Sequence, residues 1–188
     1  MIYNNYTNKD DLLKQFNEHP EFFFNHMSID QLKENEIHIS KSAKYSFDYA
    51  INVLENRFEL GEPAISKSAK FSYFYASELG DRFELGEMAI SKVALYSYHY
   101  AIFLDKRFEL GEPAISKSPE QACNYANNVV NGRFELGEPA ISTDAQYSVF
   151  YATNVLAGPF PLGEKTINDS LFYSKRYSNF IASLGNQI

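Results

Sequence analysis

The stretch that decides the fold is Arg57-Phe58-Glu59-Leu60-Gly61-Glu62, because the same hexapeptide returns at 82–87, 107–112 and 133–138. A degenerate copy occupies 159–164, and a weaker one ends at Glu36. Taking the last Glu of each copy as an anchor gives steps of 26, 25, 25, 26 and 26 residues along the chain. Self-similarity at this period is typical of a solenoid, in which each unit buries its apolar face against its neighbours.

Each unit can be numbered from its anchor Glu as position zero. Position +3 is Ile and position +13 is Tyr in all six units, and position +14 is Ala in the first five. Apolar residues at +9, +13 and +17 follow one helical stripe, and the small +14 residue allows neighbouring helices to approach closely. The spacing therefore predicts one long helix per unit.

The start of this long helix is predicted at position +4, where every residue is Ser or Asn and can cap a helix N-terminus. An alternative cap at +6 fails at Val93. The eight residues from Phe at −4 to Ile at +3 are too few for a long helix and predict a short helix or 3₁₀ turn. One-residue differences in period are expected in the loop after the long helix.

These patterns predict an all-α fold, an α-solenoid of about six short-helix/long-helix repeats. Residues 31–188 would form the repeats and residues 1–30 an N-terminal helical cap, all within a single domain. Lys175, Arg176 and Asn179 are expected to make the far end a polar outer cap.

Composition narrows the function classes. The net charge of −7 argues against nucleic-acid binding, which needs a surplus of Lys and Arg on one face. A single cysteine, Cys123, excludes an intrachain disulfide and is expected to fill the core. The sequence has neither an apolar run long enough to cross a membrane nor a leader pattern, so we expect a cytoplasmic protein.

No motif for catalysis, metal binding or a cofactor is present. The histidines have no metal-ligand spacing with one another or with Cys123, and no phosphate loop or nucleophile elbow occurs. We therefore expect a protein that is not an enzyme and holds no cofactor or metal.

Two charged ladders run along the repeats, because an Arg precedes the anchor Glu by five residues in four units. They offer a binding track for a charged partner, but we favour a structural role in which each Arg pairs with a Glu and a Tyr hydroxyl. The ladder residues are Arg57, Glu62, Arg82, Glu87, Arg107, Glu112, Arg133 and Glu138.

Specific recognition should reside where the units differ, and positions +12 and +16 are two such positions. Both are off the Tyr stripe and are expected to face outward, so aromatic residues there predict an exposed patch for a protein partner. The patch would contain Phe74, His99, Phe103 and Phe150. The competing interpretation is that curvature of the array buries one edge of this face.

Two other hypotheses remain open. A pocket in the concave face would bind a ligand, and a polar cluster in the fourth unit is its candidate site: Gln121, Asn124, Asn127 and Asn128. An acidic mimic of nucleic acid would instead need unpaired carboxylates at regular spacing. Exposed Phe and Tyr on an array also make a homo-oligomer plausible.

The pattern Arg-Phe-x-x-Gly-Glu-Pro-x-Ile followed by Tyr-x-x-x-Tyr-Ala resembles short α-helical repeats in proteins of tailed bacteriophages and some bacteria. The resemblance covers roughly residues 31–188 and departs from the pattern at Gln31 and Pro159, where the Arg is missing. It implies no known activity. It does imply a viral accessory protein, one that binds and inhibits a host or defence factor.

Overall fold

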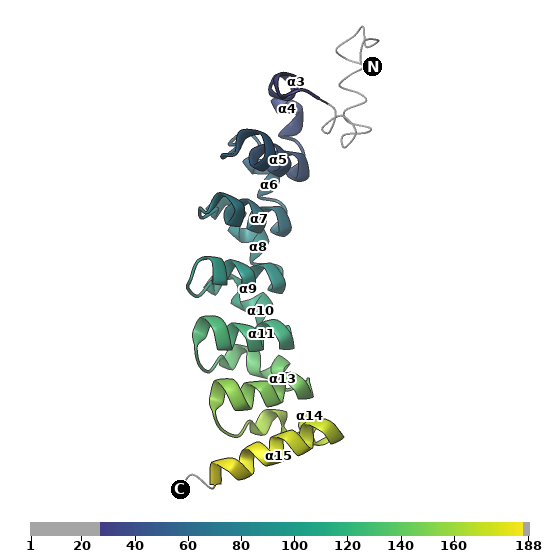
Figure 1. Cartoon of the computed structure of the whole chain (residues 1–188), viewed down its shortest axis with the longest axis vertical. Helices are drawn as coiled ribbons and strands as arrows, with labels where there is room; N and C mark the ends of the chain where they lie inside the picture. The colour runs from purple at the N-terminus through teal and green to yellow at the C-terminus, as the bar shows by residue number, and fades with distance from the viewer. Residues whose placement is uncertain (1–26, 186–188) are drawn as a thin grey trace.

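The chain is all-helical in residues 27–185, the part that the computed structural model describes. Successive pairs of short and long helices stack into a column, from α3 at one end to α15 at the other (Figure 1). Within this described part there is no strand, so the predicted all-α class is confirmed. Of the cap predicted for residues 1–30, residues 1–26 lie outside the described region.

The short segments have the predicted form of a short helix or 3₁₀ turn. The last four are a 3₁₀ turn that leads into about one turn of α-helix, whereas the first two are α-helical only. The exposed Pro at +1 is accommodated in the first turn, where its missing amide proton costs little. The segments are α3 (Ile29–Glu34) with α4 (Glu36–Ile39), α6 (Glu62–Ile65), η3 (Glu84–Gly86) with α8 (Glu87–Ile90), η4 (Glu109–Gly111) with α10 (Glu112–Ile115), η6 (Glu135–Gly137) with α12 (Glu138–Ile141), and η8 (Pro161–Gly163) with α14 (Glu164–Asn168).

The long helices lie across the column, one per unit, and three of them end in a π-helical segment. They are α5 (Ala43–Tyr49) with η2 (Ala50–Leu54), α7 (Ala69–Leu79), α9 (Ala94–Phe103), α11 (Pro119–Tyr125) with η5 (Ala126–Val130), α13 (Ala145–Phe150) with η7 (Tyr151–Leu156), and α15 (Leu171–Gly185).

The predicted cap position was wrong by two residues. Ser68, at +6, accepts from the amide of Phe71, while Ser66, at +4, ends the short helix and donates to the Pro63 carbonyl. Val93 is the N-cap of α9 and has the extended backbone of the other caps, but its side chain makes no capping hydrogen bond. A missing cap costs only about 1 kcal/mol, which one unit of a cooperative array can tolerate.

The extra residue of the 26-residue units was expected in the loop after the long helix, and this prediction was also wrong. All three 26-residue units end their long helix in a π segment, whereas the two 25-residue units between Glu62 and Glu112 do not. A left-handed residue always stands three positions before the next Phe, so the loop is constant: Glu55, Gly80, Asp105, Asn131 and Ala157. The extra residue is therefore absorbed inside the helix as a π-bulge.

The core repeats with the units. Ile at +3 and Tyr at +13 are buried in all six, and each Phe at −4 places its ring edge-on against the Tyr of the preceding unit at 4.9–5.1 Å between centroids. Gly at −1 is needed for this approach. A Cβ added at Gly86 would lie 2.5 Å from the Cβ of Ser72 in the neighbouring helix.

Candidate functional site

The charged ladder forms a hydrogen-bonded joint in each unit. In the third unit, the Arg82 Nε donates to Glu87 Oε1 at 2.6 Å, and the Tyr100 hydroxyl donates to the same oxygen at 3.0 Å. The Phe83 amide in turn donates to the Tyr100 hydroxyl at 3.3 Å. The joint therefore fastens the segment before the short helix to the long helix that follows.

The same joint recurs at Glu62, Glu112 and Glu138, with Arg Nε to Glu Oε1 distances of 2.7–2.8 Å. The Tyr hydroxyl bonds the carboxylate at 2.7–3.1 Å in these units. At the two ends of the array, Glu36 and Glu164 keep the bond from Tyr but have Gln31 and Pro159 in place of Arg. The predicted Arg, Glu and Tyr pairing is thus present in every unit that has an Arg five residues before the anchor Glu.

Electrostatics keep each joint neutral and closed. Burial, followed by the nearby Glu62 carboxylate, raises the pKa of Tyr75 to about 12. Burial also raises the pKa of Tyr100 and Tyr125, followed by the effect of Glu87 on the first and Glu112 on the second. The hydrogen bond to Glu112 raises the pKa of Arg107. Each carboxylate consequently faces a permanent cation and a protonated phenol, and the ladder is satisfied internally.

Cys123 fills the core, as expected. Its side chain is buried, and its thiol contacts the Tyr147 carbonyl at 3.6 Å. Desolvation, with a smaller effect from Asp144, raises the pKa of Cys123 to about 12. A thiol with so high a pKa is not a nucleophile at neutral pH.

Aromatic side chains from the first three units contact one another along the long-helix face, and we call this set the aromatic row. The Phe74 ring lies 5.1 Å from Tyr73, 6.4 Å from Phe47 and 6.4 Å from Tyr96. The His99 ring lies 5.9 Å from Tyr73. The row consists of half-buried side chains: Phe47, Phe71, Tyr73, Phe74, Tyr96, Tyr98 and His99.

The four predicted patch residues do not form one patch. Phe74, His99 and Phe103 are all half-buried, but the first two belong to the aromatic row whereas Phe103 packs against the buried Tyr100 ring. Phe150 is 38% exposed and lines a separate hollow of about 210 Å³ with Gln146 and Tyr173, among others. The fourth unit, which has Asn124 at +12, lies between Phe150 and the aromatic row.

The polar cluster of the fourth unit does not converge on a pocket. Gln121 is buried and Asn124 partly buried, while Asn127 donates to Asn128, which donates to the Tyr98 hydroxyl at 2.8 Å. Asn128 alone of the four lines the adjacent hollow of about 270 Å³. This volume is slightly below the range of about 300–1,000 Å³ for typical small-molecule sites.

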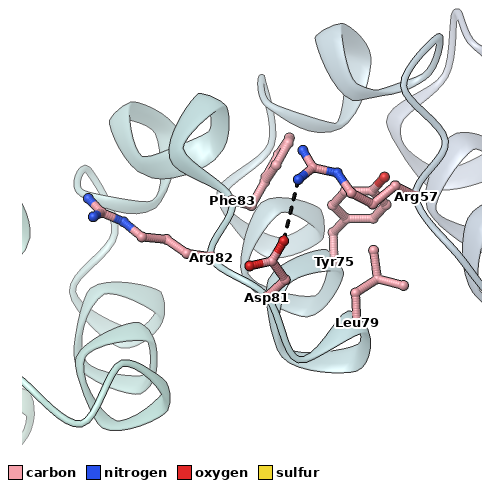
Figure 2. A pocket seen from close by; sticks show the side chains of 6 residues that line it. All are labelled: Arg57, Tyr75, Leu79, Asp81, Arg82 and Phe83. Carbon is pink, nitrogen blue, oxygen red and sulfur yellow. Dashed lines mark hydrogen bonds and ion pairs between the residues drawn. The ribbon is translucent and has the colours of Figure 1, made fainter.

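A smaller hollow lies beside the first complete joint (Figure 2). The guanidinium of Arg57 points toward Asp81, with 3.4 Å between Nη1 and Oδ2, while the side chain of Arg82 points away. The hollow encloses about 10 Å³, which is room for about one water molecule. It is a gap between neighbouring loops and too small for a substrate.

Sequence reasoning missed a row of leucines at position −2, which we call the leucine ladder. Each is 47–56% exposed although the neighbouring Phe, Gly and Ile of the same segment are buried. Its members are Leu60, Leu85, Leu110, Leu136 and Leu162. The signal was visible in the sequence, as a large apolar residue repeated in every complete copy but outside the predicted buried stripe.

Residues 27–185 contain no group of three potential metal ligands, and among their helices none has the length and apolarity to cross a membrane. Compared with known proteins, the chain matches no family model, no curated protein and no solved structure.

Proposed function

We propose that the chain is an α-solenoid of six units with an N-terminal cap, and that it works as a non-enzymatic protein-interaction module. The residues common to all units support a scaffold role, because their rings, carboxylates and amides bond to one another in the joints. Recognition is then left to residues that differ between units. Those residues lie on the long-helix face.

The aromatic row carries this proposal. Phe74 contacts rings from both neighbouring units, so it is held in a fixed position while part of its ring remains exposed. Ordered aromatic side chains lose little entropy on binding, and such residues dominate the energy of protein interfaces. The preferred partner is therefore a protein with an apolar or aromatic contact surface.

The two alternatives have less support. A small-molecule site would need a larger cavity, lined by more of the four candidate residues, than the open hollow of about 270 Å³ beside Asn128. An acidic mimic of nucleic acid needs free carboxylates, but the anchor Glu62, Glu87 and Glu112 side chains are each bonded to an Arg and a Tyr. Of the exposed Glu at −3, Glu84 and Glu135 also pair with the Arg of their own unit.

The resemblance to phage repeat proteins suggests the class of partner. We propose a bacterial host or defence factor that the chain inhibits by covering part of its surface. The proposal is tested with tagged chain added to bacterial lysate, comparing the native sequence with a Phe74→Glu/His99→Glu variant.

We expect one stoichiometric protein to be retained by the native chain and lost with the variant. Phe172→Glu is the matched control, because Phe172 is more exposed than Phe74 and lies on α15, away from the row. Circular dichroism checks that all three chains are folded. Equal retention by a folded row variant would contradict the proposal.

A further inference from the structure

The leucine ladder is not explained by the scaffold or by the aromatic row. It belongs to the short segments, and the next exposed residue in each of them, at +1, is also apolar in four units. Met88 at this position is 59% exposed, and the others are Pro63, Pro113 and Pro139. Single exposed leucines are ordinary, but a continuous apolar strip marks an interaction surface.

The strip is large enough to hold a stable partner. Five helix layers, each about 8–10 Å thick, give a strip that is roughly 40–50 Å long. With a helix about 10–12 Å wide, the strip covers on the order of 500 Å². Two such strips bury about 1,000 Å² together, which is the lower bound for a specific interface.

We infer that the occupant of the leucine ladder is a second copy of this chain. An interface that uses every leucine requires a partner whose apolar groups recur with the same spacing. A second copy has that spacing by construction. This self-association goes beyond the proposed function, because it uses the short-helix face and leaves the aromatic row free.

Charges on the short segments define how the copies pair. In units two to four the short segment begins at an exposed Glu at −3 and is followed by an exposed Lys at +5, so its two ends carry opposite charge. Of these carboxylates, Glu84 also lies 3.5 Å from the Arg82 guanidinium of its own chain. Units two to four have both residues: Glu59 with Lys67, Glu84 with Lys92, and Glu109 with Lys117.

A two-fold axis parallel to the column reverses the direction of each short segment but preserves the order of the units. It therefore places Glu of one copy opposite Lys of the other, with every unit facing its counterpart. A two-fold axis across the column would oppose Glu with Glu, which is unfavourable. The inferred dimer consequently has two columns that run parallel.

The first test is the oligomeric state of the purified chain by sedimentation velocity over a concentration series. The native chain should be a dimer, and Leu85→Glu/Leu110→Glu should raise the dissociation constant at least about 100-fold, because it buries carboxylates in an apolar interface. Leu95→Glu/Leu171→Glu is the control, since both leucines are exposed but off the ladder. A monomeric native chain, or a ladder variant as dimeric as the native chain, would overturn the inference.

Orientation has an independent test that leaves the leucines intact. Met88→Cys should form a disulfide with its own counterpart under oxidation, because parallel columns place equal units together, whereas Cys123 is buried and does not compete. Antiparallel columns would instead link Met88→Cys with Pro139→Cys. That result, or the absence of either cross-link, would overturn the parallel dimer.

A charge exchange tests the inferred ion pairs. Lys117→Glu should weaken the dimer, and Glu109→Lys/Lys117→Glu should restore it, since the two charges meet across the two-fold axis. No recovery in the double variant would contradict this arrangement. A ladder variant that no longer dimerises should still capture the protein partner through the aromatic row. That result would show that dimerisation and partner binding use different surfaces.

Discussion

The edge of the Phe83 ring meets the Tyr75 ring of the preceding unit at 4.9 Å between centroids. The Phe83 amide meanwhile donates to the hydroxyl of Tyr100 in its own unit. Each Phe thus joins two tyrosines, one through its ring and one through its backbone, and this alternation continues from Tyr49 to Tyr177. The array is held together by a connected series of such joints.

Within a joint, the carboxylate should contribute more to the free energy of unfolding than the guanidinium does. Glu112 is largely buried and bonds both Arg107 and Tyr125, whereas Arg107 is half-exposed and its charge is screened by solvent. Glu112→Ala should lower the free energy of unfolding by about 1–3 kcal/mol. Arg107→Ala should cost less than about 1 kcal/mol. Urea unfolding of both variants measures this order, and a larger loss for Arg107→Ala would refute it.

The glycine before the anchor should tolerate no side chain. A Cβ at Gly111 would lie 2.6 Å from both Phe108 Cδ1 and Ser97 Cβ, so Gly111→Ala should cost about 1–3 kcal/mol through overpacking. Gly132 lies in a loop with no atom within 4 Å of the added Cβ, and Gly132→Ala should be neutral or slightly stabilising. Thermal unfolding followed by circular dichroism compares them. Equal midpoints would show that the close approach is not required.

Alkaline pH should open the joints. The pKa of Tyr75 is raised from 10.0 to about 12, so the folded state holds this proton more tightly than the unfolded state does. The stabilisation is therefore complete below pH 10 and lost as the pH rises through about 12. Tyrosinate absorbance should show the exposed tyrosines titrating first and the buried ones only as helicity is lost. Full ionisation near pH 10 with helicity intact would contradict the described burial.

Because the 26-residue units absorb their extra residue in a π segment, one residue should be removable there. Deleting Asn128 from η5 leaves Tyr125 and Asn131 five residues apart, as Tyr75 and Gly80 are in the second unit. The shortened chain should fold with a small loss of stability. Deleting Lys117 instead shifts Tyr125 relative to Glu112 and should unfold the unit. Equal thermal midpoints for the two deletions would place the extra residue elsewhere.

Much of the joint could be predicted from the sequence, because a residue repeated at a fixed distance must meet the same neighbours in every unit. This logic found Ile at +3, Tyr at +13 and the pairing of Arg82 with Glu87. The same logic failed where two different structures are compatible with the same repeated residues. Ser occurs at both +4 and +6, and one added residue fits equally well in a loop or a helix, so backbone geometry had to decide.

The candidate site was less predictable, for a different reason. Contacts among Phe47, Phe74 and Tyr96 depend on the rotation from one unit to the next. Periodicity gives each residue's position on its own helix but not that rotation. The Phe103 contact has a different origin, because Phe103 lies one turn from Tyr100 on the same helix, α9, and packs against its ring.

The central claim is that a protein partner binds the aromatic row. The most direct measurement replaces His99 with a photo-reactive phenyl ketone amino acid and irradiates the tagged chain inside bacterial cells. The account predicts one discrete protein adduct at position 99 and none from the same label at Phe172. No adduct at position 99, or the same adduct at both positions, would contradict it.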